Sequence, residues 1–174
     1  GYAALKEAEE ERTRQFREEA SHSELPQDQG MEWQPIRFPS SLERTGLYNY
    51  DGNIWLKREF YWPHTTEGDG VIHLGRADDD DHTYLNGHYL GSTFGEYELT
   101  AYQLPEGVLR TGYNTVLVKL HDRHYNGGLL GPKGKMFVGL QHPTARFRLP
   151  LHGEWSYQIP NEEQIASPYY HLPL

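Results

Sequence analysis

The stretch that decides the fold is residues 74–87, LGRADDDDHTYLNG, in which four consecutive aspartates precede a short strand and an Asn-Gly turn. Residues 71–74 lead into it as a strand. Asn86 and Gly87 are the pair that a type I′ hairpin needs, because both positions take positive φ. Neighbouring carboxylates repel one another, so the aspartates have to be solvated, capped by backbone amides or paired with a cation. The pattern predicts a loop at the end of a β-sandwich.

Two roles are open for Asp78, Asp79 and Asp81. Carboxylates are hard oxygen ligands and strong acceptors, so these side chains could bind Ca²⁺ or accept hydrogen bonds from sugar hydroxyls. Alternatively, Asp78 and Asp79 cap backbone amides in the turn while Asp81 pairs with Arg58 or Arg76. We favour the structural role, because loop aspartates usually form such local turns, and we predict no bound metal and no cofactor. Asp79 and Asp81 are kept as candidate ligand contacts.

Short strands separated by turns continue along the chain. Residues 53–62 place Ile54, Leu56 and Phe60 on one face, and Arg58 interrupts that face. A cation there needs a partner, and we expect an ion pair across the sheet. Further strands are predicted at residues 115–120, 135–140, 146–151 and 154–159, between turns that contain Gly, Pro or Asn. No internal repeat and no long helical period after residue 30 is evident, so the predicted fold is all-β: a β-sandwich or jelly roll with an N-terminal connector helix.

The two ends of the chain differ from the middle. Residues 3–20 predict a polar helix with opposite charges four apart, such as Lys6 and Glu10, and its narrow apolar stripe is typical of a connector that leans on a neighbour. The predicted division is therefore a connector helix and linker at residues 1–30, a jelly-roll domain at 31–160 and a C-terminal tail at 161–174.

Composition restricts the partners. The chain has 174 residues and a formal net charge of −9, which disfavours broad attraction to nucleic acid or an anionic membrane. Neutral carbohydrate is compatible with that charge, and thirteen Tyr and four Trp supply rings for sheets and for stacking on sugars. The absence of cysteine excludes disulfides, thiolate catalysis and cysteine-ligated metals. No apolar run is long enough to span a bilayer, and no signal peptide opens the sequence.

Five sequence blocks carry a resemblance to a known family. In chain order they are residues 51–60 (DGNIWLKREF), the aspartate block at 74–87, residues 112–116 (GYNTV), residues 127–132 (GGLLGP) and residues 151–157 (LHGEWSY). Each is weak alone, but their order and spacing resemble the accessory jelly-roll domain inserted into sialate O-acetylesterases. That domain is related to the galactose-binding-like, sugar-binding domain of family-two glycoside hydrolases. The resemblance implies a secreted or periplasmic parent protein.

The resemblance also bears on catalysis. The esterases keep their Gly-x-Ser nucleophile before this domain and their Asp-x-x-His segment after it, and neither a GDS, GQS nor GxSxG sequence occurs here. The chain therefore predicts a non-enzymatic accessory domain whose partners are carbohydrate and the catalytic esterase domain of the same parent. A zinc site at His121, Asp122 and His124 is less favoured than ordinary loop polarity, because no HExxH is present.

The candidate ligand contacts lie mainly in one loop. Tyr and His combine a ring with a polar tip, and the adjacent Gly127 and Gly128 let a backbone approach a partner closely. The ligand-binding residues that we predict are Arg123, His124, Tyr125, Asn126, Tyr48, Tyr50, Asp79 and Asp81. A polar loop shaped by glycine turns is the alternative for residues 123–126. For the whole chain, an independent carbohydrate-binding module and a purely architectural or dimerisation domain are the alternatives to the esterase accessory domain.

Overall fold

The computed structural model describes residues 1–8, 11, 32–42, 44, 52–95, 98–122 and 127–160. Residues 2–8 and 11 are helical, which agrees with the predicted N-terminal helix, and the rest of that helix lies outside the described residues. The described helical residues are exposed, including Tyr2 and Leu5 at 83% and 70%. In the part of the chain that the structure describes, no helix is long and apolar enough to cross a membrane.

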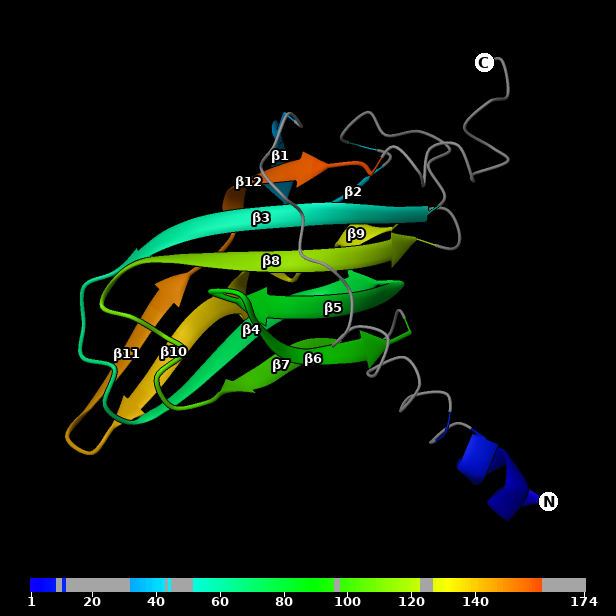
Figure 1. The fold of residues 1–174 in the computed structure, drawn as a ribbon, viewed down its shortest axis with the longest axis horizontal. Coiled ribbons are helices and arrows are strands. Elements are labelled where there is room, and N and C mark those ends of the chain that lie inside the picture. Colours follow the sequence, from blue (N-terminus) through cyan, green and yellow to red (C-terminus); the bar gives the residue numbers. More distant parts are fainter. Residues whose placement is uncertain are drawn as a thin grey trace.

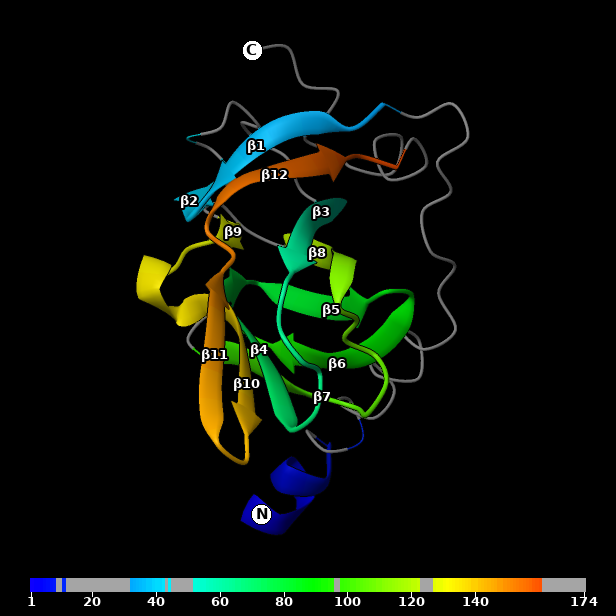
Figure 2. The same ribbon diagram turned by 90° about the vertical axis from the view of Figure 1, so that its left-hand side faces the viewer.

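The domain is a sandwich of two antiparallel sheets, as predicted (Figure 1). The first sheet has the order β1-β12-β3-β8-β5-β6, and the second has the order β11-β10-β4-β9-β2, with β7 also paired to β4. Figure 2, turned by 90°, shows β10 and β11 of the second sheet to the left of β3, β8, β5 and β6 of the first. The strands are β1 (Gln34–Phe38), β2 (Ser40–Ser41), β3 (Gly52–Trp62), β4 (Asp69–Asp78), β5 (Asp80–Leu85), β6 (His88–Phe94), β7 (Leu99–Leu104), β8 (Gly112–Asp122), β9 (Gly128–Leu129), β10 (Met136–His142), β11 (Ala145–Pro150) and β12 (Gly153–Gln158), and a short 3-10 helix, η2 (Lys133–Lys135), precedes β10.

The predicted strands are all present, and most are longer than the sequence indicated. The longest pairing joins β3 to β8 over eleven residues, from Gly52 opposite Asp122 to Trp62 opposite Gly112. Alternate residues of these strands face the second sheet, so Ile54, Leu56, Val116 and Val118 are fully buried in one apolar core. This core holds the two sheets together and fixes which side chains of β3 remain on the outer surface.

The predicted hairpin turn is confirmed. Leu85 pairs with His88, which leaves Asn86 and Gly87 as the two-residue loop, and their φ angles are 50° and 81°. Positive φ at both positions gives the twist that continues the right-handed twist of the flanking strands. Asn86 is therefore in a conformation that only a few non-glycine residues tolerate well.

Candidate functional site

The aspartate run is a buried corner between the two sheets and not the predicted loop at the end of the sandwich, and of the three alternatives for its carboxylates the burial excludes solvation. Asp78 ends β4 and Asp80 begins β5, so the chain crosses there from the second sheet to the first. All four aspartate side chains are buried, with at most 5% of each residue exposed. Hydrogen-bond donors reach the carboxylates of Asp80 and Asp81 inside the corner, whereas the buried Oδ1 of Asp78 has no hydrogen-bond partner.

Asp81 shows how the corner accommodates a carboxylate. The hydroxyls of Thr83, Thr100 and Tyr102 donate to it at 2.7, 3.3 and 2.6 Å. The backbone amide of Thr93 also donates to it, so all of its donors are neutral and the expected pairing with Arg58 or Arg76 is wrong. Burial raises the pKa of Asp81 to about 6, although the hydroxyl hydrogen bonds oppose this rise.

Asp80 is capped by a backbone amide, while the predicted amide capping by Asp78 and Asp79 stays a prediction. The backbone amide of Gly95 donates to Asp80 at 3.1 Å, and the backbone amide of Asp79 donates to the carbonyl of His121. Asp79 and Asp81, both predicted as ligand contacts, are thus packed inside the corner and do not line the cleft described below. Among the described residues, no group of three or more His, Cys, Asp or Glu side chains is arranged to hold a metal ion.

Two glycines make room for close packing. A Cβ atom on Gly91 would lie 2.7 Å from the ring of Tyr102, the residue whose hydroxyl reaches Asp81. A Cβ atom on Gly128 would lie 2.6 Å from the carbonyl oxygen of Ser40. Gly128 therefore lets β9 approach β2 within the sandwich, whereas the sequence suggested that it admits a ligand.

Two asparagines join the hairpin turn to the start of β8. The Asn86 side chain donates to the carbonyl of Val108 and to Oδ1 of Asn114, and it accepts from the amide of Thr115. Asn114 donates to the carbonyls of Arg110 and Gly112 and accepts from the Arg110 amide. Both side chains are thus fully used in holding two loops together, which is a structural role.

Six of the predicted contact residues cannot be placed. Tyr48, Tyr50 and the segment Arg123, His124, Tyr125 and Asn126 lie outside the described residues, so their role stays a prediction. Other parts of the domain must supply the geometry of a candidate site.

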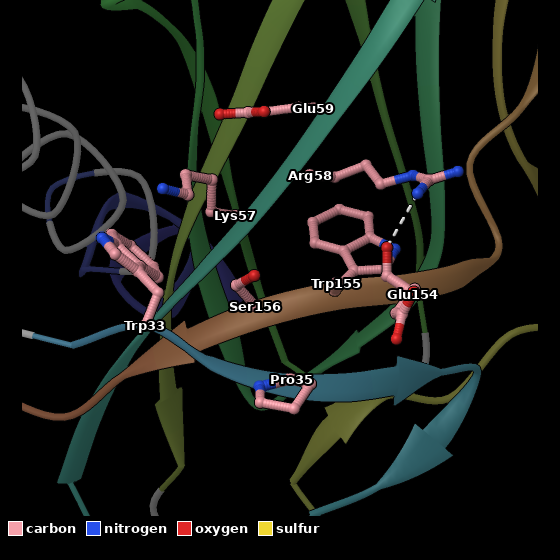
Figure 3. Close-up of a pocket in the computed structure, with 8 residues that line it drawn as sticks. All are labelled: Trp33, Pro35, Lys57, Arg58, Glu59, Glu154, Trp155 and Ser156. Carbon is pink, nitrogen blue, oxygen red and sulfur yellow. Dashed lines mark hydrogen bonds between the residues drawn. The ribbon is translucent and has the colours of Figure 1, made fainter.

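A cleft of about 440 Å³ opens where the first sheet splits. β12 pairs with β3 only from Ser156 opposite Lys57 to Gln158 opposite Trp55, although β12 remains paired with β1 as far as Gly153. From Arg58 onward, towards the C-terminal end of β3, the two strands separate, and the cleft lies between them (Figure 3). Its lining residues are Trp33, Pro35, Lys57, Arg58, Glu59, Glu154, Trp155 and Ser156.

Arg58 bridges the split. Its Nη1 donates to the backbone carbonyl of Glu154 at 2.8 Å and so occupies an acceptor on the separated strand β12 (Figure 3). The expected cross-sheet ion pair is therefore replaced by a bond to a main-chain oxygen, while the Glu154 carboxylate acts on Arg58 only through space. Partial burial lowers the pKa of Arg58, and attraction by Glu154 opposes that shift. The buried Nε of Arg58 has no hydrogen-bond partner.

The other side of the cleft combines an aromatic ring with charge. The Lys57 ammonium lies 4.3 Å from the centre of the Trp33 ring, a cation–π arrangement that orders both half-buried side chains. Glu59 follows on the same face of β3, because residues two apart in a strand point the same way. The cleft thus offers two cations, carboxylate acceptors, the Ser156 hydroxyl and a Trp ring within one concave surface.

Exposed rings continue this surface along β3. Tyr61 is two residues beyond Glu59 and pairs in register with Tyr113 of β8. The two rings meet edge to face with centroids 5.1 Å apart, and the two residues are 53% and 78% exposed. From Lys57 to Tyr61 the strand advances about 13 Å. Large rings left in water at the end of a polar strip are typical of a surface that binds an amphipathic ligand.

A Ser–His pair on the outer face of the first sheet does not form a convincing nucleophile. The Ser92 hydroxyl lies 2.6 Å from His82 Nδ1 and also 2.6 Å from the Tyr89 hydroxyl. Burial, with the nearby Lys119 and His121 charges, lowers the pKa of His82 to about 4. An imidazole with that pKa is a weak general base near neutral pH, so the pair is suited to a structural hydrogen-bond chain.

Sequence reasoning predicted none of the cleft residues as a ligand contact, and it singled out Arg58 only as a cation that needs a partner. Arg58 was found because a cation interrupts an apolar strand face, but the sequence gave no indication that β12 would separate from β3 beside it. Trp33 and Lys57 carried a usable signal, since a Trp before the first strand and a Lys next to Arg58 could have been considered as sugar contacts. Their proximity depends on a pairing between strands far apart in the chain.

Comparisons with known proteins were made on sequence and on structure. No protein-family model matches the sequence, and no curated protein matches it. Similar solved structures include a β-glucuronidase from Ruminococcus gnavus, at 15% identity, a TM-score of 0.47 and coverage of 80% of this chain and 31% of that chain. An α-L-rhamnosidase from Streptomyces avermitilis, solved with L-rhamnose, is 16% identical with a TM-score of 0.49, covering 79% of this chain and 13% of that one.

A β-glucuronidase from Lactobacillus rhamnosus gives comparable values: 15% identity, a TM-score of 0.47 and coverage of 72% of this chain and 23% of that one. The present chain thus spans less than a third of the length of each of these three structures. At identities and TM-scores this low, the likeness assigns neither a substrate nor an activity to it.

Proposed function

We propose that this chain is a non-catalytic carbohydrate-binding domain that holds glycan in the cleft between β3 and β12. The observation that carries the proposal is the cleft itself, in which Trp33, Lys57 and Arg58 meet the carboxylate of Glu59 and the hydroxyl of Ser156. Sugars present hydroxyls that both donate and accept hydrogen bonds, and C–H faces that pack on aromatic rings. A cleft that contains donors, acceptors and an indole suits both features.

The exposed Tyr61–Tyr113 pair supports an oligosaccharide over a monosaccharide. It lies on the outer face of β3 about 13 Å along the strand from Lys57, so an extended ligand leaving the cleft can meet a second aromatic contact. The finer proposal is that the domain serves a larger carbohydrate O-acetylesterase of the sialate O-acetylesterase type, next to whose catalytic domain it positions glycan. This part rests on the five sequence blocks.

Binding measurements on the isolated chain test the proposal. We would titrate it calorimetrically with sialylated, galactosylated and xylose-based oligosaccharides, and repeat the titrations with Trp33→Ala and Lys57→Gln. Loss of a stacking ring should cost about 1 kcal/mol, which is about a five-fold weaker Kd. Arg110→Gln, an exposed cation outside the cleft, is the matched control for Lys57→Gln and should leave the Kd unchanged.

The possible outcomes separate the proposal from its alternatives. Glycan binding that weakens in both cleft variants and not in the control supports it. Binding that both cleft variants retain places the glycan elsewhere and overturns the cleft assignment. No binding to any of the three glycan classes favours an architectural domain. We also expect no hydrolysis of acetylated sugars by this chain, because no nucleophile with a competent base is present in the described residues.

A further inference from the structure

The outer face of the second sheet carries a cluster of exposed cations, which we call the basic face. Arg146 and Arg148 alternate on β11, so both project from the same side of that strand, about 7 Å apart. Lys133 and Lys135 of η2 stand before the adjacent strand β10, and all four side chains are exposed. Figure 2 shows β11 at the edge of this sheet.

A stack of flat groups orders one of these cations. The His73 ring stacks on the Phe137 ring at 4.4 Å with an angle of 18°, and the Arg148 guanidinium lies 3.6 Å from the centre of the Phe137 ring. Arg148 Nη2 also donates to the carbonyl of Gly134. A guanidinium fixed in this way has lost its side-chain freedom before any ligand arrives, and its remaining N–H groups can form a paired contact with a carboxylate or sulfate.

The charge of the basic face runs against that of the whole protein. The chain has a net charge of −9, yet no carboxylate among the described residues lies within the 4.0 Å salt-bridge distance of these four cations. Asp69 of β4 lies in the same cross-strand row as Arg146, with Gln141 of β10 between them, so this carboxylate stands two strands away from Arg146. The face is thus left with uncompensated positive charge.

Protection of an edge strand explains only part of this arrangement. Charged side chains and a proline on an edge strand prevent pairing with other chains, which accounts for Arg146, Arg148 and Pro150 on β11. It does not require two lysines in η2, nor does it require Arg148 to be held flat on a ring. These features favour recognition of an anionic partner.

We propose that the basic face binds an acidic polysaccharide, one that carries carboxylate or sulfate groups along an extended chain. Two arginines spaced about 7 Å apart along a straight strand suit anions that recur along a polymer. The choice of a polysaccharide over an acidic peptide rests on the proposed function. The contact lies on the opposite sheet from the cleft, so the domain would hold acidic glycan on one side while the cleft holds a second segment.

Binding to defined polyanions tests this proposal. The probes are polygalacturonate for carboxylates and dextran sulfate for sulfates, with neutral dextran and poly-L-glutamate as comparisons, each measured at low and at physiological salt. The variant Arg146→Gln/Arg148→Gln removes two cations from the face. Its control, Arg44→Gln/Arg110→Gln, removes two exposed cations elsewhere and changes the net charge equally. A second variant, Phe137→Leu, removes the stack and leaves the charges in place.

We expect wild type to bind at least one acidic polysaccharide, and Arg146→Gln/Arg148→Gln to weaken that binding at least ten-fold while the control changes it less than two-fold. Phe137→Leu should weaken it several-fold, because Arg148 is no longer ordered, and salt should weaken it in wild type.

Equal losses in variant and control, or no binding to either acidic polysaccharide, overturn the proposal. Equally tight binding to poly-L-glutamate also overturns it, since the face then recognises charge alone. For this comparison the cleft variants Trp33→Ala and Lys57→Gln are measured on the uncharged galactosylated and xylose-based oligosaccharides, so failure of either proposal is visible separately.

Discussion

Asp81 makes the stability of the domain depend on pH in an unusual direction. Burial raises the folded-state pKa of this carboxyl from 3.8 to about 6, so the folded chain binds a proton more tightly than the unfolded chain. The contribution of this group to the free energy of unfolding is therefore fully present below pH 3.8 and is lost as pH rises through about 6. A shift of about two pKa units corresponds to about 3 kcal/mol, of which about 2 kcal/mol falls between pH 4 and pH 7.

The substitution Asp81→Asn isolates this contribution, because asparagine has the same shape and does not ionise. We expect the free energy of unfolding of wild type, relative to Asp81→Asn, to increase by about 2 kcal/mol between pH 7 and pH 4. Other titrating groups, His82 included, are common to both proteins and largely cancel in the difference. Urea unfolding followed by tryptophan fluorescence at several pH values gives the measurement.

Asp69→Asn, which removes an exposed carboxylate from β4, is the control for the loss of one negative charge. A wild-type advantage that stays constant from pH 4 to pH 7 would refute the reasoning, as would one that shrinks as pH falls. The second outcome would mean that the three hydroxyl donors stabilise the carboxylate more than burial destabilises it.

Three further predictions concern the packing around the corner and the hairpin. Gly91→Ala should destabilise the domain by about 2 kcal/mol, because the new methyl group displaces the Tyr102 ring from Asp81, whereas Gly134→Ala, which meets no neighbouring atom, should have little effect in the same urea titration. Asn114→Ala should cost about 2 kcal/mol, since it removes the part-buried hydrogen bonds that join Arg110 to the start of β8, and a Tm close to that of wild type would contradict this. His82 has a folded-state pKa of about 4, below its ordinary value, so its contribution to stability is present above pH 6.5 and is lost as pH falls towards 4. His82→Gln should therefore remove part of the acid-induced loss of stability, as thermal melts at pH 4 and pH 7 would detect.

Local chemistry determined much of the fold. The strands around residues 53–62 and 115–120 could be predicted because apolar and polar residues alternate with the two-residue period of a sheet. The turn at Asn86 and Gly87 could be predicted because few residue pairs accept positive φ at both positions. These are properties of neighbouring residues, so the sequence alone was sufficient for them.

The aspartate run illustrates where local chemistry is insufficient. The sequence correctly required the carboxylates to be solvated, capped or paired, but their actual donors include Thr100 and Tyr102, about twenty residues further along the chain. The hydroxyls become available only when β7 packs beside the corner, so the run by itself indicated local amide capping and an arginine partner for Asp81.

The cleft and the basic face were decided by tertiary structure alone. Arg58 was recognisable as a cation on an apolar face, but its acceptor on Glu154 exists only because β12, almost a hundred residues away, separates from β3 at that point. Likewise, His73, Phe137 and Arg148 stack because three strands align in register. Residue patterns specify which face of a strand is buried. Contacts between side chains far apart in the chain depend on the order and register of the strands, and sequences with the same apolar pattern can adopt different orders and registers.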